Sequence, residues 1–297
     1  MLPPIRHDGP VDFVRQVTAG RRPVTILPTT KRLSTNYNML NHKSFGEGPT
    51  LVILHGLFGM LDNWQSLARK WADHYQVILV DLRNHGRSPH VPDMDYDLMA
   101  EDVAELLESL GVDECILLGH SMGGKVAMQA AFDYPELVTK LVVVDIAPRR
   151  YHPGHATIFA ALDAVDPADI SNRKEAGEAM SLHVSDPGIQ LFLSKNLTRN
   201  PEGGFRWRMN LEAIREFYPR LIGPVGQAGD AFEAPALFIR GGKSGYVQDD
   251  DWPLIDILFP QAELATVEGA GHWVHAERPE ELMRVVDGFL ATGELHS

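Results

Sequence analysis

The stretch that decides the fold is Gly119-His120-Ser121-Met122-Gly123-Gly124, which directly follows the apolar run Cys115-Ile116-Leu117-Leu118. It fits the pattern G-x-S-x-G between a strand and a helix, in which a sharp turn exposes the serine as a nucleophile. The turn leaves no room for side chains two positions either side of the serine, and glycine has no Cβ to clash there. The helix-like run that follows would point free backbone N–H groups at the site, where they stabilise negative charge. The stretch therefore predicts a nucleophilic Ser121.

Short apolar runs alternate with helical patterns on both sides of this stretch, which indicates a mostly parallel sheet covered on both faces. The expected strands cover residues 50–54, 76–80, 115–118, 141–144, 236–239 and 263–267, with one or two antiparallel strands in residues 33–43. The expected helices cover residues 63–74, 96–110, 122–132, 252–258 and 279–291. Gly111 is placed to end the second helix, and Pro279 to begin the last one. We expect an α/β fold whose mostly parallel central sheet is flanked by helices.

Residues 149–234 interrupt this alternation. They contain helical pieces, at residues 156–165, 172–184 and 207–218, with prolines between them. An insertion of this size between two core strands indicates a helical cap, placed after the sixth core strand when two strands are counted in residues 33–43. The expected organisation is an N-terminal extension at residues 1–31, a core made of residues 32–148 and 235–297, and a cap at residues 149–234.

Composition excludes several classes of partner. The net charge is −13, which argues against nucleic acid or an anionic membrane as the main partner. No apolar run approaches the roughly 20 residues that span a bilayer. The single cysteine, Cys115, cannot form an intramolecular disulfide, and we expect a reducing, cytoplasmic compartment. The arginines of residues 1–31 are compatible with a transit peptide, which Asp8, Asp12 and the scarcity of serine disfavour.

A serine needs a base, and the carboxyl ends of parallel strands share one edge of a sheet. His272 follows the last expected strand and is predicted to reach Ser121 there, whereas the rival His275 is expected on the next segment, away from that edge. Two backbone amides would hold the oxyanion, one from Leu57 in the loop after residues 50–54 and one from Met122. His55 in the same loop is expected to be structural.

Five segments together resemble the serine hydrolases of the α/β-hydrolase superfamily. Within it, residues 40–292 are similar to the small esterases of the subgroup of YbfF and abhydrolase domain protein eleven. The segments are His55-Gly56-Leu57-Phe58-Gly59, the run from Asp81 to Pro89, Gly119 to Lys125, Asp145-Ile146-Ala147-Pro148, and Gly269 to His275. The run that begins at Asp81 is expected to brace its own loop.

The resemblance bears most on the acid that completes a catalytic triad with Ser121 and His272. Many superfamily members carry an aspartate after the strand at residues 235–239, where this chain has Ser244. This chain resembles enzymes of the YbfF type, which have a serine at that later position and place the acid after an earlier strand. Here that earlier strand is the one expected at residues 141–144, and Asp145 follows it. We therefore expect Asp145 to orient His272, with Ser244 as an auxiliary hydrogen-bonding group. The competing acids, which follow Ser244, are Asp249, Asp250 and Asp251.

The resemblance implies hydrolysis of carboxylic esters with short to medium acyl chains through an acyl-enzyme on Ser121. The same triad would suit a thioesterase, an acyltransferase or a perhydrolase, and a non-catalytic ligand-binding member of the fold is the alternative from another class. We expect no metal, because neither the His152–His155 stretch nor Asp249–Asp251 offers a credible ligand set. No nucleotide fingerprint occurs, so no cofactor is implied and the expected partner is a small-molecule ester. Apolar candidates for the substrate pocket are Phe58, Phe159, Phe192, Phe205, Trp207, Met209, Phe217 and Trp273.

Overall fold

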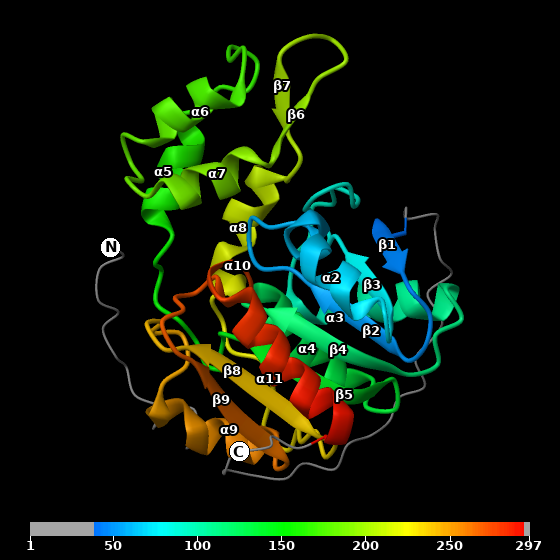
Figure 1. The fold of residues 1–297 in the computed structure, drawn as a ribbon. Coiled ribbons are helices and arrows are strands. Elements are labelled where there is room, and N and C mark those ends of the chain that lie inside the picture. Colours follow the sequence, from blue (N-terminus) through cyan, green and yellow to red (C-terminus); the bar gives the residue numbers. More distant parts are fainter. Residues whose placement is uncertain (1–38, 294–297) are drawn as a thin grey trace.

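The computed structural model describes residues 39–293, which build one seven-stranded sheet and a separate inserted lobe (Figure 1). The strands lie in the order β1-β3-β2-β4-β5-β8-β9, and within this sheet only β1 runs antiparallel to its neighbour. The central position of β4 brings the carboxyl ends of β2 and β5 to either side of its own. The strands are β1 (His42–Phe45), β2 (Thr50–Leu54), β3 (Gln76–Val80), β4 (Cys115–His120), β5 (Val138–Val144), β8 (Ala236–Gly241) and β9 (Ala262–Val267).

Helices cover both faces of the sheet, so the strands inside it contribute side chains to two cores. In β2, Val52 and Leu54 face one core, whereas Leu51 and Ile53 face the other. Burial on both faces explains why β2, β3 and β4 are almost continuous apolar runs. The first core includes α3 (Tyr96–Ser109), α4 (Met122–Asp133) and α9 (Trp252–Leu258), and the second includes α2 (Gln65–Trp71) and α11 (Pro279–Thr292).

The predicted fold class is confirmed, and most element bounds agree with the structure. The strands β2 and β3 and the helix α9 have the expected bounds, and Gly111 follows the end of α3 in the left-handed conformation with φ of 70°. The strands β4, β5 and β8 are longer than expected because polar or small residues at their ends also join the ladder. The expected extension at residues 1–31, and any strand within residues 33–38, lie outside the described residues.

The inserted lobe lies between β5 and β8 and stands over the carboxyl ends of the strands (Figure 1). It follows the fifth strand of the described chain. Besides helices it contains a short hairpin, which the sequence analysis did not predict and which occupies the start of the helix expected from residue 207. Gly203 and Gly204, with φ of 110° and 68°, supply the turn of that hairpin. Its elements are α5 (Ala156–Asp163), α6 (Arg173–Met180), α7 (Pro187–Ser194), β6 (Leu197–Arg199), β7 (Phe205–Trp207) and α8 (Leu211–Leu221).

Lys125 ties both connections of this lobe to the helix that begins at Met122. Its ammonium group donates to the carbonyl of Arg149 on the outgoing connection, at 2.7 Å, and to the carbonyl of Gly223 on the returning one. The side chain is 1% exposed, and the nitrogen lies 4.9 Å from the ring centre of Tyr151. Burial lowers the pKa of Lys125 well below its usual value. One buried amino group thus donates to two carbonyl groups, one on the segment that enters the lobe and one on the segment that leaves it.

We expect Lys125→Met to lower the free energy of unfolding by about 2–6 kcal/mol, because two buried carbonyls lose their donor at about 1–3 kcal/mol each. Lys140→Met is the matched control, since the Lys140 ammonium donates to one carbonyl, that of Leu290, at 2.7 Å. Lys140 is only partly buried, so water replaces its lost bond and the expected cost is about 1 kcal/mol or less. Urea titration measures both values. Equal losses of unfolding free energy in the two variants would contradict this role of Lys125.

Candidate active site

Ser121 occupies a strained turn between β4 and α4. Its backbone has φ of 54° and ψ of −120°, a conformation that L-residues rarely adopt. The turn depends on glycine at both flanks. A Cβ at Gly119 would lie 2.1 Å from the carbonyl oxygen of Gly123, and a Cβ at Gly123 would lie 2.5 Å from the carbonyl oxygen of Leu54. The close packing explains the spacing of the sequence pattern, and it lifts the serine side chain above the end of the sheet.

His272 lies within hydrogen-bonding distance of Ser121, in the loop after β9. The Ser121 hydroxyl donates to Nε2 of His272 at 3.0 Å, and Nδ1–H of His272 donates to Oδ2 of Asp145 at 2.7 Å. These two partners assign the proton of the neutral imidazole to Nδ1. The free lone pair on Nε2 therefore faces the serine, as a general base requires. The structure brings together the three residues that the sequence analysis selected.

Asp145 is held on the far side of His272 by several donors. It follows β5 directly, is fully buried, and has φ of 54°. Its Oδ1 accepts from the backbone N–H of Gly241 at 2.9 Å, and its Oδ2 also accepts from the hydroxyl of Ser244. Ser244 therefore contacts the acid as the sequence analysis expected of an auxiliary group.

The competing acids after Ser244 lie elsewhere. Asp249 is 88% exposed and pairs with Arg240 at 2.6 Å, and Asp251 accepts from Nε of Arg149 at 2.6 Å. Asp249, Asp250 and Asp251 begin the connection to α9 as a short 3-10 helix. Among the described carboxylates, Asp145 is the one whose hydrogen bond reaches His272.

Two neighbours hold the His272 ring and were not predicted from the sequence. The ring of Tyr246 stacks on it, with centroids 3.9 Å apart and planes at 19°. His120, the residue before the serine, donates from Nε2 to the backbone carbonyl of His272 at 2.8 Å. Stacking and backbone anchoring together restrict the ring to the orientation in which it meets Ser121. The x position of G-x-S-x-G was the available signal for His120, whereas nothing in the sequence placed Tyr246.

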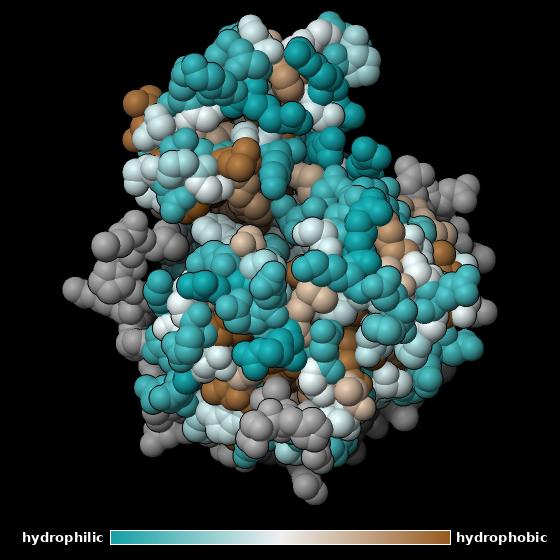
Figure 2. Space-filling model, viewed as in Figure 1, coloured by the Kyte–Doolittle hydropathy of each residue, from teal (hydrophilic) through white to brown (hydrophobic). Residues whose placement is uncertain are grey.

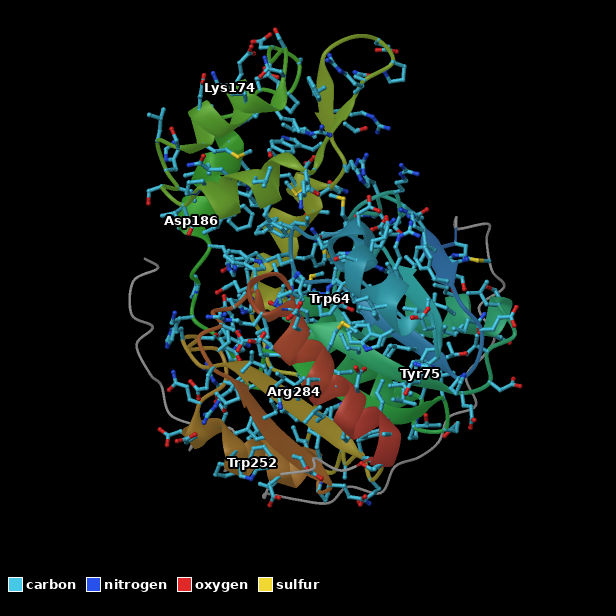
Figure 3. The ribbon with its side chains drawn as sticks, viewed as in Figure 1. Trp64, Tyr75, Lys174, Asp186, Trp252 and Arg284 are labelled. Atoms are coloured by element: carbon cyan, nitrogen blue, oxygen red, sulfur yellow. The ribbon has the colours of Figure 1, made fainter. Side chains whose placement is uncertain are left out.

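The position of His275 differs from the expected one. It was expected away from the active edge, but the short helix α10 (Val274–Glu277) turns the chain back, and His275 lines the same pocket as Ser121. Its ring stacks on Trp64, with centroids 4.5 Å apart, and no described hydrogen bond joins it to the serine. Trp64 lies where the inserted lobe meets the sheet (Figure 3). Burial lowers the pKa of His275 to about 3 and that of His155 to about 4, so both are neutral at pH 7.

The loop after β2 carries Leu57, and Met122 begins α4, so the two amides expected to hold the oxyanion come from separate segments. Residues Gly56 to Gly59 form a turn closed by a hydrogen bond from Gly59 N–H to the Gly56 carbonyl at 2.9 Å. Within the described residues, the amides of Leu57 and Met122 donate to no protein acceptor. The His55 contacts are structural: Nδ1–H donates to the Gly56 carbonyl at 2.8 Å and Nε2 accepts from Leu82 N–H at 3.1 Å.

The Asp81 loop has the bracing role that was expected of it. Its carboxylate is buried and accepts from the backbone N–H groups of Leu61 at 2.7 Å and Arg87 at 2.9 Å, and from the Asn41 side chain at 2.7 Å. A Cβ at Gly86 would lie 2.1 Å from this carboxyl group, so the loop needs glycine there.

An apolar pocket opens above Ser121, between the loop after β2 and the inserted lobe. Figure 2 shows hydrophobic residues on the underside of the lobe, where it meets the body. Among the lining residues, Phe58, Phe192 and Trp273 were predicted, whereas Trp207 lies in β7 and packs against the core instead. None of the described residues that line this pocket is a lysine, arginine, aspartate or glutamate. The lobe contributes Gly154, His155, Ile158, Ile189, Phe192 and Leu193 to the lining.

The remaining apolar candidates of the lobe are packed in its interior. Phe159, Phe205 and Met209 belong to the buried core cluster, and Phe217 packs against it. Their burial leaves the lobe's side of the pocket wall to Phe192 and to aliphatic side chains from α5 and α7. The prediction of an apolar pocket agrees with the lining, although most of the side chains named for it stabilise the lobe.

Metal binding and membrane insertion are the other possibilities for residues 39–293. No group of three or more His, Cys, Asp or Glu side chains within that range could hold a metal ion. No helix in the same range is long and apolar enough to cross a membrane. Cys115 is buried in β4, and burial raises the pKa of its thiol to about 12, so it is no rival nucleophile.

A serine on a strand-to-helix turn, a histidine after the last strand and a buried acid, placed on a mostly parallel sheet, define a hydrolase of the α/β class. Comparison with known proteins agrees. The family model described as alpha/beta hydrolase fold matches residues 49–279, and the chain belongs to this family.

Individual relatives share much of the sequence. The chain is 40% identical to a mouse (Mus musculus) protein named sn-1-specific diacylglycerol lipase ABHD11, across 97% of this chain and 94% of that protein. It is 39% identical to esterase YbfF of Escherichia coli K12, across 81% of this chain and 92% of that protein. A solved structure titled marine microorganism esterase superposes with a TM-score of 0.83 at 41% identity, across 84% of this chain and 99% of that chain.

Proposed function

We propose that this hydrolase cleaves carboxylic esters of short to medium acyl chains through an acyl-enzyme on Ser121. The observation that carries the proposal is the line of hydrogen bonds from Ser121 through His272 to Asp145 beneath an apolar pocket. The names of the related esterases and lipase support the same reaction.

Acylation begins when Ser121 Oγ attacks the ester carbonyl while its proton passes to Nε2 of His272. The carbonyl oxygen becomes an oxyanion, and the amides of Leu57 and Met122, which have no protein acceptor among the described residues, are its proposed donors. The Asp145 carboxylate stabilises the imidazolium through Nδ1–H, and Ser244 and Gly241 N–H hold that carboxylate in place. His272 then protonates the departing alkoxide, which leaves as the alcohol.

Deacylation repeats these steps with water as the attacking group. Nε2 of His272 takes a proton from the water while its oxygen attacks the acyl carbonyl, and the same two amides receive the oxyanion. Collapse of the intermediate returns the proton to Ser121 and releases the carboxylic acid. No step needs a metal or an organic cofactor.

The inserted lobe, residues 149–234, acts in this proposal as a cap that selects the acyl group. Its helices α5 and α7 supply Ile158, Ile189, Phe192 and Leu193 to the pocket. A wall of this kind excludes water from an uncharged chain but offers no partner to a charged one, so esters with a terminal carboxylate are poor substrates. The proposed compartment is the cytoplasm, because the one cysteine is a buried free thiol.

A panel of p-nitrophenyl esters from acetate to palmitate tests the proposal. We expect kcat/KM to be highest among acetate to octanoate and to fall by about tenfold or more at palmitate, because a chain longer than the pocket would extend into water. A hemisuccinate ester, a matched thioester and a diacylglycerol emulsion complete the panel. Preference for palmitate or for diacylglycerol would overturn the proposed acyl class, and a thioester preference would change the proposed bond.

A further inference from the structure

Phe58 stands in the turn that carries the proposed oxyanion donor Leu57, and its backbone conformation is unusual. It is the third residue of the Gly56 to Gly59 turn and has φ of 59°. Turns normally fill this left-handed region with glycine or asparagine, because a side chain is strained there. A bulky residue keeps such a conformation only where its surroundings hold it. The direction of the Leu57 amide therefore depends on the contacts of Phe58.

Those contacts come from both the core and the inserted lobe. On the core side, Phe58 N–H donates to Nε2 of His85 at 3.2 Å. On the lobe side, the Phe58 ring meets the edge of Phe159 in α5, with centroids 5.5 Å apart. The lobe also reaches the backbone directly, because Nδ2 of Asn196 donates to the Phe58 carbonyl at 2.8 Å. The turn is thus held at Phe58 by His85 of the core and by Phe159 and Asn196 of the lobe.

The position of Asn196 is fixed by burial and by hydrogen bonds of its backbone and side chain. It lies between α7 and β6, and its side chain is fully buried. Its own N–H donates to the Leu193 carbonyl at 3.0 Å, and its carbonyl accepts from Arg208 N–H at 2.7 Å. The amide must point its nitrogen at Phe58, since the reverse orientation would oppose two oxygen atoms. The same orientation leaves Oδ1 without a partner among the described residues, which is a cost that a merely structural asparagine would avoid.

We infer that Asn196 is a positioning residue of the inserted lobe, which holds the Gly56 to Gly59 turn so that the Leu57 amide faces the oxyanion. The inference rests on the proposed function. Its consequence is that seating the lobe does more than enclose the substrate. It also completes the oxyanion hole, so transition-state stabilisation depends on a residue that does not touch the substrate.

The test compares Asn196→Ala with Asn210→Ala. Asn210 is a matched control, because it also lies in the lobe and also bonds a core residue of positive φ, Asn84. Its N–H donates to the Asn84 carbonyl at 2.8 Å, and its Nδ2 donates to Asn84 Oδ1 at 3.1 Å. It makes no described contact with the oxyanion turn.

Steady-state kinetics on a short p-nitrophenyl ester is the first readout. For Asn196→Ala we expect kcat to fall by about tenfold to a hundredfold while KM changes by less than about threefold, because a misaligned donor weakens the transition state more than the substrate complex. For Asn210→Ala we expect both constants to stay within about threefold of wild type.

Binding of a trifluoromethyl ketone is the second readout. Ser121 adds to its carbonyl, the serine proton passes to His272, and the resulting hemiketal oxygen occupies the oxyanion hole. We expect Asn196→Ala to weaken this binding by the same factor as kcat/KM, within about threefold, since both report the transition state. General loosening of the lobe would instead raise KM. The loss of inhibitor binding and the loss of kcat/KM would then differ by more than about threefold.

The outcomes separate the inference from the proposed function. Ester turnover that is retained in the Ser121→Ala variant would overturn the proposed function. Serine-dependent turnover with Asn196→Ala equal to wild type or to Asn210→Ala, or altered in KM alone, would overturn the inference only. If Asn196→Ala does not fold, Asn196→Leu, which keeps the volume but has no donor, decides between the same two results.

Discussion

Replacing Ser121 with alanine is expected to lower kcat for ester hydrolysis by about 10⁴- to 10⁶-fold, because the reaction loses the group that forms the acyl-enzyme. The loss should appear in kcat with KM little changed, since the pocket and the proposed oxyanion donors remain. A p-nitrophenyl ester assay at saturating substrate measures it. Any remaining rate should come from attack by water in the same site.

Ser194→Ala is the matched control for this substitution. Ser194 is buried in the inserted lobe, and its hydroxyl donates to the Leu191 carbonyl at 2.9 Å. It makes no described hydrogen bond with Ser121, His272 or Asp145. We expect its kcat to stay within about threefold of wild type. Native-like turnover by Ser121→Ala would move the function to another residue or to the non-catalytic binding alternative.

The second large effect is expected for Asp145→Asn, with kcat lower by about 10⁴-fold. The carboxylate accepts from Nδ1–H of His272, from Ser244 and from Gly241 N–H, and an amide nitrogen in its place cannot accept. The imidazole would then carry its proton on Nε2, which could no longer take the proton of Ser121.

Asp249→Asn distinguishes this assignment from the competing acid. Asp249 is exposed and pairs with Arg240, so we expect its turnover to remain within about threefold of wild type. The same ester assay compares both variants. Near-native turnover in Asp145→Asn together with a large loss in Asp249→Asn would reverse the assignment of the acid.

The sequence predicted the core best where burial alone decides the structure. The strands β2 and β3 are short apolar runs bounded by polar residues, and their bounds agree with expectation. The hairpin of β6 and β7 was missed because three-residue strands are too short to show a period of two. Trp207 was therefore expected on a helix and in the pocket, whereas the hairpin carries it to the core.

The site was predictable to the extent that its residues follow strands. Ser121, His272 and Asp145 each come directly after a strand end or its loop, and parallel strands bring such positions to one edge. The contact between Asn196 and Phe58 spans 138 positions and depends on how the lobe packs, so no spacing reveals it. His275 was misplaced for a similar reason, since the fold of the chain after His272 decides where α10 lies.

Covalent catalysis by Ser121 requires that the acyl group reside on this serine during turnover, where it can be located chemically. The wild-type enzyme is mixed with p-nitrophenyl acetate, quenched in acid in the steady state, digested and analysed by mass spectrometry. We expect one acetyl group per labelled chain, on the peptide that contains Ser121, and none on that peptide in Ser121→Ala. An acetyl group that accumulates with turnover on another residue, or turnover with no acyl-enzyme on Ser121, would contradict it.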